Sequence, residues 1–100
     1  MKSKIEEIDG KFVATLEGEM DTAAAVEAEE VLKPLYTSNG NDVNIDCKNL
    51  EYIASRGLRI LLGILKGAKA SGSKVTLRDV NEDIKSVLQL TGFISIFEFE

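Results

Sequence analysis

Strand-like and helix-like patterns alternate along nearly the whole of this chain, and their order restricts the fold more than any other feature. The chain begins with two runs, Ser3–Ile8 and Lys11–Glu17, in which apolar and polar residues partly alternate. Asp9-Gly10 separates them, and this dipeptide between two such runs is typical of a tight β-hairpin. We therefore expect two antiparallel strands before the first helix.

The rest of the chain continues this alternation. A helix begins at Asp21, and Pro34 should kink or end it because proline has no backbone N–H. Asn39-Gly40 then predicts a turn. The apolar stripe of this helix is Ala24, Ala28, Val31, Leu32 and Leu35, and its solvated face is Glu27, Glu29 and Glu30. The later elements are a strand at Val43–Cys47, an apolar helix after Ser55 that ends at Ser71-Gly72, a strand at Lys74–Leu77, a helix capped by Asn81 that stops at Gly92, and a strand at Phe93–Phe99.

The predicted order is ββαβαβαβ, which indicates an α/β fold. The expected architecture is a mixed, mostly parallel sheet of about five strands, packed with three or more helices. The 100 residues contain no linker or repeat, so we expect one domain, residues 1–100. Sites in such sheets collect where strands end and helices begin. Here those junctions are Gly18–Thr22, Asn49–Leu58 and Asp79–Glu82.

Composition removes several classes of function. The 17 acidic and 12 basic residues give a net charge of −5, which disfavours binding to nucleic acid or anionic lipid. Because the chain has no histidine and one cysteine, it cannot hold a histidine-based catalytic site, an internal disulfide or a cysteine zinc site. We expect a monomeric, cytoplasmic protein that is not an enzyme and has no metal, cofactor or membrane segment. Cys47 should be a buried small hydrophobe.

The junction before the apolar helix carries the most chemistry. Ser55 is predicted to be the N-cap of that helix, with its hydroxyl accepting from a backbone N–H one turn ahead. A phosphate on Ser55 would lie at the positive end of the helix dipole, within reach of Arg56 and Arg59. Gly57 lacks a β-carbon, so a partner could approach closely there. On local pattern alone a purely structural cap is the more common role, Gly57 could simply relieve crowding between helix and strand, and the arginines could be solvated surface.

A family resemblance favours the regulatory role of Ser55 over the purely structural one. Ile53–Leu62 resembles the phosphorylation-site motif of the anti-sigma factor antagonists, which belong to the STAS family. Further matches in the correct order are Leu16–Asp21, Asp46–Leu50, Gly72–Asn81 and Val87–Phe97.

The resemblance implies a protein switch. An anti-sigma factor that is itself a serine kinase would phosphorylate Ser55, and a metal-dependent serine phosphatase would reverse the reaction. The dephosphorylated protein would bind the kinase and release a sigma factor. The partner-binding residues would be Glu19, Asp21, Ala54, Ser55, Arg56, Gly57, Leu58 and Arg59.

Two positions depart from the family pattern. Ala54 stands where many members have Asp, and Arg56 where many have a second Ser. These departures motivate an alternative, a STAS scaffold that is never phosphorylated or a module that senses an anion or nucleotide. Asp21 also has an ordinary role as the N-cap of the first helix, and both roles can hold together.

Overall fold

The computed structural model describes residues 1–37 and 40–100, so the turn predicted at Asn39-Gly40 lies partly outside the described residues. The elements run in the order β1 (Lys2–Ile8), β2 (Lys11–Met20), α1 (Thr22–Leu32), the 3₁₀ helix η1 (Lys33–Thr37), β3 (Val43–Ile53), α2 (Ser55–Ala70), β4 (Val75–Arg78), α3 (Glu82–Leu90), the 3₁₀ helix η2 (Phe93–Ser95) and β5 (Glu98–Phe99). The predicted change at Pro34 is confirmed, because α1 gives way to η1 at Lys33.

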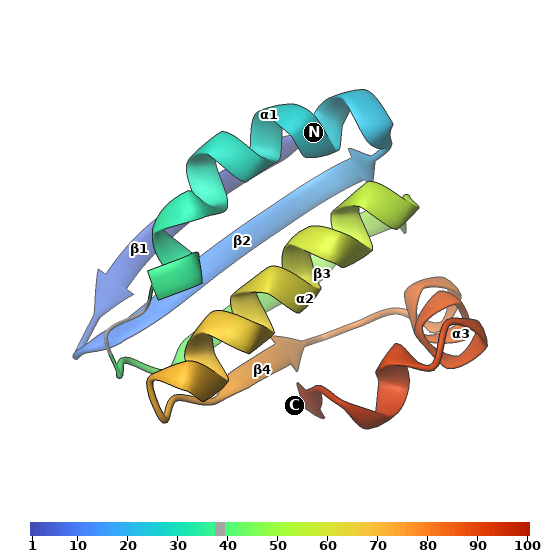
Figure 1. Ribbon diagram of the computed structural model, residues 1–100. Coiled ribbons are helices and arrows are strands. Elements are labelled where there is room, and N and C mark those ends of the chain that lie inside the picture. The colour runs from blue at the N-terminus through green and yellow to red at the C-terminus, as the bar shows by residue number, and fades with distance from the viewer. Residues whose placement is uncertain (38–39) are drawn as a thin grey trace.

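The strands form one five-stranded sheet in the order β1-β2-β3-β4-β5 (Figure 1). β1 is antiparallel to β2, and each later pair is parallel, so the predicted mixed α/β sheet is confirmed. Ile8 pairs with Lys11 across a two-residue turn. Asp9 (φ 51°) and Gly10 (φ 77°) both adopt positive φ, as a type I′ hairpin turn requires.

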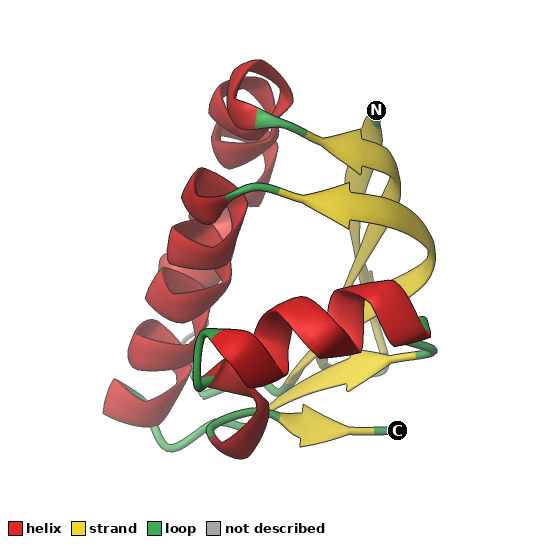
Figure 2. Ribbon diagram, turned by 90° about the vertical axis from the view of Figure 1, so that its right-hand side faces the viewer, coloured by secondary structure: helices red, strands yellow, loops and turns green. Residues whose placement is uncertain are grey.

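The helices lie on one side of the sheet, as Figure 2 shows. Strand side chains that face α1 and α2, such as Leu16 and Ile45, are buried, whereas those of Thr15 and Asp46 on the opposite face are only half-buried. This alternation is what a sheet with one covered face produces. The largest fully buried side chains are Leu16, Met20, Leu32, Leu35, Ile45, Leu50, Leu61, Ile64, Leu77, Leu88, Val43 and Val75.

Two glycines of α2 allow η1 to lie directly against the helix. A β-carbon on Gly63 would come within 2.8 Å of Cε1 of Tyr36. One on Gly67 would collide with the backbone carbonyl of Tyr36. Their four-residue spacing puts both glycines on one face of α2, so the helix has a flat strip where the chain after α1 packs.

β3 is longer than the sequence pattern predicted. The expected strand, Val43–Cys47, continues to Ile53, and its buried positions after Cys47 are spaced by three residues (Leu50, Ile53). The pairing of β2 with β3 shifts register twice beyond Thr15. These irregularities interrupt the two-residue period of an ordinary strand, which is why the continuation was missed.

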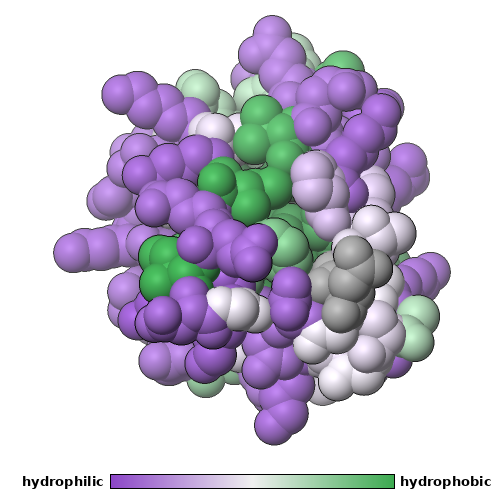
Figure 3. Space-filling model, turned by 90° about the vertical axis from the view of Figure 1, so that its left-hand side faces the viewer, coloured by the Kyte–Doolittle hydropathy of each residue, from purple (hydrophilic) through white to green (hydrophobic). Residues whose placement is uncertain are grey.

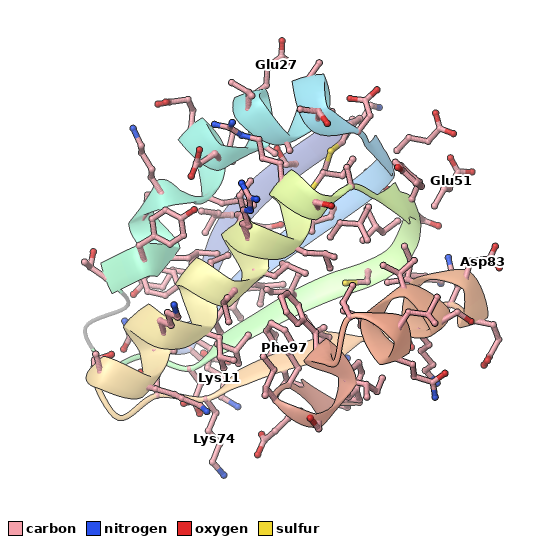
Figure 4. All side chains as sticks on the ribbon, turned by 45° about the vertical axis from the view of Figure 1, so that its right-hand side comes forward. Lys11, Glu27, Glu51, Lys74, Asp83 and Phe97 are labelled. Atoms are coloured by element: carbon pink, nitrogen blue, oxygen red, sulfur yellow. The ribbon has the colours of Figure 1, made fainter. Side chains whose placement is uncertain are left out.

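The carboxyl-terminal prediction was partly wrong. Of the strand expected at Phe93–Phe99, only Glu98–Phe99 is a strand, and Phe93–Ser95 is the 3₁₀ helix η2. Phe97 is nevertheless buried and points into the interior in Figure 4. On α1, Val31 is 40% exposed rather than core, and Ala25 is buried in its place.

Candidate functional site

The three predicted junctions meet at one end of the sheet, where β2, β3 and β4 terminate. The backbone N–H of Ala54 donates to the carbonyl oxygen of Met20 at 2.8 Å, which joins the first junction to the second. The side-chain amide of Asn81 donates to the carbonyl oxygen of Leu50 at 2.8 Å, which joins the third to the second. Parallel strands bring these segments together, and the hydrogen bonds hold them there.

Ser55 is the first residue of α2, and its side chain is exposed. The prediction that it is the N-cap is wrong. Ala54 occupies the cap position, with extended backbone (φ −84°, ψ 169°), and no side chain caps this helix. A methyl group cannot accept a hydrogen bond, so the N-terminal amides of α2 have no side-chain partner. The Ser55 hydroxyl is therefore displayed beside an uncapped helix terminus.

Gly57 and Leu58 point inward rather than toward a partner. A β-carbon on Gly57 would lie 2.5 Å from Sδ of Met20 and 2.7 Å from Cγ1 of Ile53. Leu58 belongs to the buried core. Of the two interpretations open for Gly57, the structure favours relief of crowding between helix and strand. Gly57 and Leu58 therefore act on the surface only by fixing how α2 sits against β2 and β3.

Arg56 forms an ion pair with a residue of α1. Its Nη2 lies 3.7 Å from Oε1 of Glu29, and Oε2 of Glu29 accepts a 2.9 Å hydrogen bond from the Tyr36 hydroxyl. Burial and the neighbouring Glu29 carboxylate raise the pKa of Tyr36 from 10.0 to about 12. The prediction that Glu29 is part of the solvated face of α1 is wrong, because this side chain is half-buried between Arg56 and Tyr36.

Arg59 remains available at the surface. It lies one turn after Ser55 and is exposed. Within residues 1–37 and 40–100 it forms no ion pair. Residues three or four positions apart lie on the same side of a helix, so Arg59 is on the same side of α2 as Ser55. Of the two arginines, Arg59 is the one without an ion pair among the described residues.

Asp21 and Glu19 lie beside this helix start. The prediction that Asp21 caps α1 is confirmed, since its Oδ1 accepts from the backbone N–H of Ala24 at 2.8 Å. Glu19 pairs in register with Tyr52 of β3, and both side chains are exposed. The turn that follows β2 thus forms the surface next to Ala54 and Ser55.

Sequence reasoning missed most of the charge at this end of the sheet. Figure 4 shows Glu51 and Asp83 at the same end of the molecule, although they come from β3 and α3. Lys11 and Lys74 lie toward the other end. Tyr52 adds an aromatic side chain that is 49% exposed. The exposed acidic residues of the three junctions are Glu19, Asp21, Glu51, Asp79 and Glu82, and the exposed Asp83 follows directly after them. The parallel strand order was the feature that could have grouped these residues.

The arrangement can bind a protein and accept a charged group. Free backbone amides at the start of α2 favour an anion, and the exposed hydroxyl of Ser55 can be reached by a modifying enzyme. Across the described ranges, no three His, Cys, Asp or Glu side chains are grouped to hold a metal ion. No helix in those ranges is long and apolar enough to cross a membrane.

Comparison with known proteins gives one consistent result. The STAS domain family profile matches residues 2–100. BtrV of Bordetella bronchiseptica, provisionally named an anti-sigma factor antagonist, is 31% identical over 97 residues, which are 97% of this chain and 84% of BtrV. The anti-sigma-B factor antagonist of Staphylococcus epidermidis is 31% identical over 84% of this chain and 78% of its own. The Bacillus cell fate determinant SpoIIAA, solved in its phosphorylated form, superposes with a TM-score of 0.75 at 17% identity, over 99% of this chain and 91% of that chain.

Proposed function

Because this chain belongs to the STAS domain family, we propose that it is an anti-sigma factor antagonist that binds its anti-sigma factor through the surface around Ser55. Its relatives carry that name at 31% identity over most of their length. The observation that carries the proposal is the exposed Ser55 hydroxyl at an uncapped helix start. A modifying enzyme can reach this hydroxyl without any part of the fold opening.

The proposed switch is phosphorylation of Ser55 by an anti-sigma factor that is a serine kinase. The phosphate would add about −1.5 to −2 charges at neutral pH to a surface that already has Glu19, Asp21 and Glu51 around it. The amides of α2 and the free guanidinium of Arg59 can stabilise that charge locally. A partner that packs closely against the free hydroxyl would no longer fit, because the phosphate adds both bulk and negative charge at the contact. A metal-dependent serine phosphatase would restore the binding form.

Ala54 and Arg56, the two residues that depart from the family pattern, affect this proposal in different ways. Ala54 leaves the helix uncapped, which keeps its amides available to a phosphate. Arg56 is already paired with Glu29 of α1, so part of its charge is offset before a phosphate is added. The changed residues therefore leave the phosphate site intact and change the groups that a kinase meets on either side of it.

The experiment combines the protein with its cognate anti-sigma factor and ATP, and locates the phosphate by mass spectrometry. We expect phosphate on Ser55, none in Ser55→Ala, and unchanged incorporation in Ser86→Ala, a matched control because Ser86 is an exposed helical serine on α3. Binding of the unmodified protein should exceed that of Ser55→Asp by at least about tenfold, which corresponds to about 1.4 kcal/mol. Phosphate on another residue, or equal affinity of the wild type, Ser55→Ala and Ser55→Asp, would contradict the switch.

The second candidate is a STAS scaffold that binds its partner without modification. The ion pair of Arg56 with Glu29 favours it, since one of the two neighbouring cations already has an acidic partner. In that case the partner would bind the wild type but transfer no phosphate. The same mass-spectrometric measurement separates the two candidates, and a thermal-shift series with nucleotides and oxyanions tests for a bound small anion, because ligand binding to the native state raises the Tm.

A further inference from the structure

β1 is an open edge of the sheet. Among the described residues no strand pairs with its outer side. In a two-residue hairpin the residues that flank the turn exchange both backbone hydrogen bonds, so Ile8 pairs with Lys11 in this way. The pattern alternates along an antiparallel pair. The N–H and C=O groups of Ser3, Ile5 and Glu7 therefore point away from β2, toward the open edge.

The charges of β1 are complementary to those of a second β1 that runs in the opposite direction. With a two-fold axis at Ile5, Lys4 lies opposite Glu6 of the second copy, and Glu6 lies opposite its Lys4. These are non-hydrogen-bonded positions, where Cα atoms are about 4.5 Å apart and side chains are closest. The two side chains already lie on one face, with Lys4 Nζ 3.1 Å from Glu6 Oε1, and are 65% and 51% exposed.

The register with the axis at Ile5 is the one free of repulsion. If the axis moves to Lys4, two Lys4 side chains face each other; if it moves to Glu6, two Glu6 side chains do. Like charges directly opposite destabilise a strand pair. The Ile5 register also uses all seven residues of β1, and places the half-buried Ile5 side chains of the two copies in contact on the helix side of the sheet.

A groove beside the edge leaves room for the second copy. It has a volume of about 600 Å³ and lies between β1 and α1. On the helix side its wall is formed by Ala24, Glu27, Ala28 and Val31, a stripe that is apolar except for Glu27. Val31 of this wall is 40% exposed, and Figure 3 shows apolar atoms bordered by hydrophilic side chains on this side of the molecule.

We propose that β1 is a self-association edge: two copies of this chain pair β1 with β1 antiparallel about Ile5 and join their sheets into one. Three hydrogen-bonded residue pairs, Ile5 with Ile5 and Ser3 with Glu7 twice, connect the copies, and two Lys4–Glu6 ion pairs flank them. The helices of both copies lie on the same side of the joined sheet, so the two α1 stripes face each other across the axis. This interface goes beyond the proposed function and does not depend on Ser55.

The test uses charge reversal in the full chain. Sedimentation velocity or light scattering over a concentration series from micromolar to millimolar should show a monomer–dimer equilibrium. Lys4→Glu gives β1 two glutamates at the paired positions, and Glu6→Lys gives it two lysines. Each variant alone should dissociate with a Kd at least about tenfold higher. An equimolar mixture of the two should form the dimer again, because each glutamate then meets a lysine. The double variant with both changes should behave as the wild type.

Circular dichroism of each variant provides the folding control, since both changes are on exposed side chains of an edge strand. A monomer at every concentration would overturn the proposal. A dimer that persists unchanged in both single variants would also overturn it, because the contact would then lie elsewhere. Association of β1 only with a peptide of another protein would assign the edge to a different partner and contradict the proposal as well.

Discussion

The backbone N–H of Ala54 lies 2.8 Å from the carbonyl oxygen of Met20, so the residue that precedes Ser55 is fixed to the end of the neighbouring strand. Ser55 thus owes its position to backbone bonding and to the packing of Gly57, with no hydrogen bond from its own side chain to α2. Because the Ser55 side chain does not cap α2, it can be modified without loss of the fold.

The capping residues should differ in their effect on stability. Ser55→Ala should change the free energy of unfolding by less than about 0.5 kcal/mol, as for an ordinary surface change. Asp21→Ala should cost about 1 kcal/mol, because it removes the bond to the Ala24 amide. Asn81→Ala should cost more, since Asn81 caps α3 and also bonds Leu50. Urea denaturation measures all three; an equal loss for Ser55→Ala and Asp21→Ala would show that the serine hydroxyl does cap α2.

Gly57→Ala should destabilise the protein although alanine is the better helix former. The added methyl would meet Sδ of Met20 at 2.5 Å and Cγ1 of Ile53 at 2.7 Å, and overpacking of this kind costs about 1–3 kcal/mol. Arg59→Ala is the matched control, because it changes an exposed position of the same helix. The denaturation midpoint should fall for Gly57→Ala and stay nearly constant for Arg59→Ala. A more stable Gly57→Ala protein would mean that the approach of α2 to the strands is looser than described.

Tyr36 should titrate at unusually high pH. Burial and Glu29 raise its pKa from 10.0 to about 12. A raised pKa means that the stabilisation from protonated Tyr36 is complete below pH 10 and is lost as the pH rises toward about 12. In a Tyr52→Phe background the tyrosinate absorbance reports Tyr36 alone, because the chain has two tyrosines.

In this titration, Glu29→Gln should lower the pKa of Tyr36, since a nearby negative charge is removed. Arg56→Gln should raise it, since the arginine charge opposes the shift. Changes of the same sign in both variants would contradict the arrangement of the three side chains.

Cys47 should be nearly inert in the folded protein. It is 1% exposed, and burial first, then Asp46 and Asp79, raise the pKa of its thiol from 9.0 to about 12. Because the thiolate is the reactive form, labelling by a disulfide reagent at neutral pH should proceed through unfolding and accelerate with urea. Protein unfolded in concentrated urea supplies the reference rate. Rapid labelling of the native protein, at a rate independent of urea, would show that β3 opens locally around Cys47.

Much of the fold could be predicted from local pattern. The hairpin followed from Asp9-Gly10, and the caps at Asp21 and Asn81 followed from residue type, because these features depend on neighbours in sequence. The order of strands and helices then limited the sheet to a mostly parallel one.

What could not be predicted depends on residues distant in sequence. The contact of Arg56 with Glu29 needs α1 and α2 to pack side by side, and no pattern within either helix specifies it. The carboxyl-terminal strand was overestimated because the apolar alternation of Phe93, Phe97 and Phe99 fits both a strand and a 3₁₀ turn followed by a short strand. The cap was assigned to Ser55 because serine is the better cap by residue type, whereas packing against Met20 and Ile53 starts the helix one residue earlier.

The two shifts in the pairing of β2 with β3 have a consequence for how the chain would respond to a deletion. From Thr15 to Met20, β2 advances five positions, while β3 advances seven, from Asp46 to Ile53. The two additional residues of β3 set the direction of the chain where it reaches Ser55. Loss of a single residue between Lys48 and Glu51 would leave every reactive group present and rotate the serine out of register with the Asp21 turn. A substitution within this stretch keeps its length and should therefore leave the direction of the chain at Ser55 unchanged.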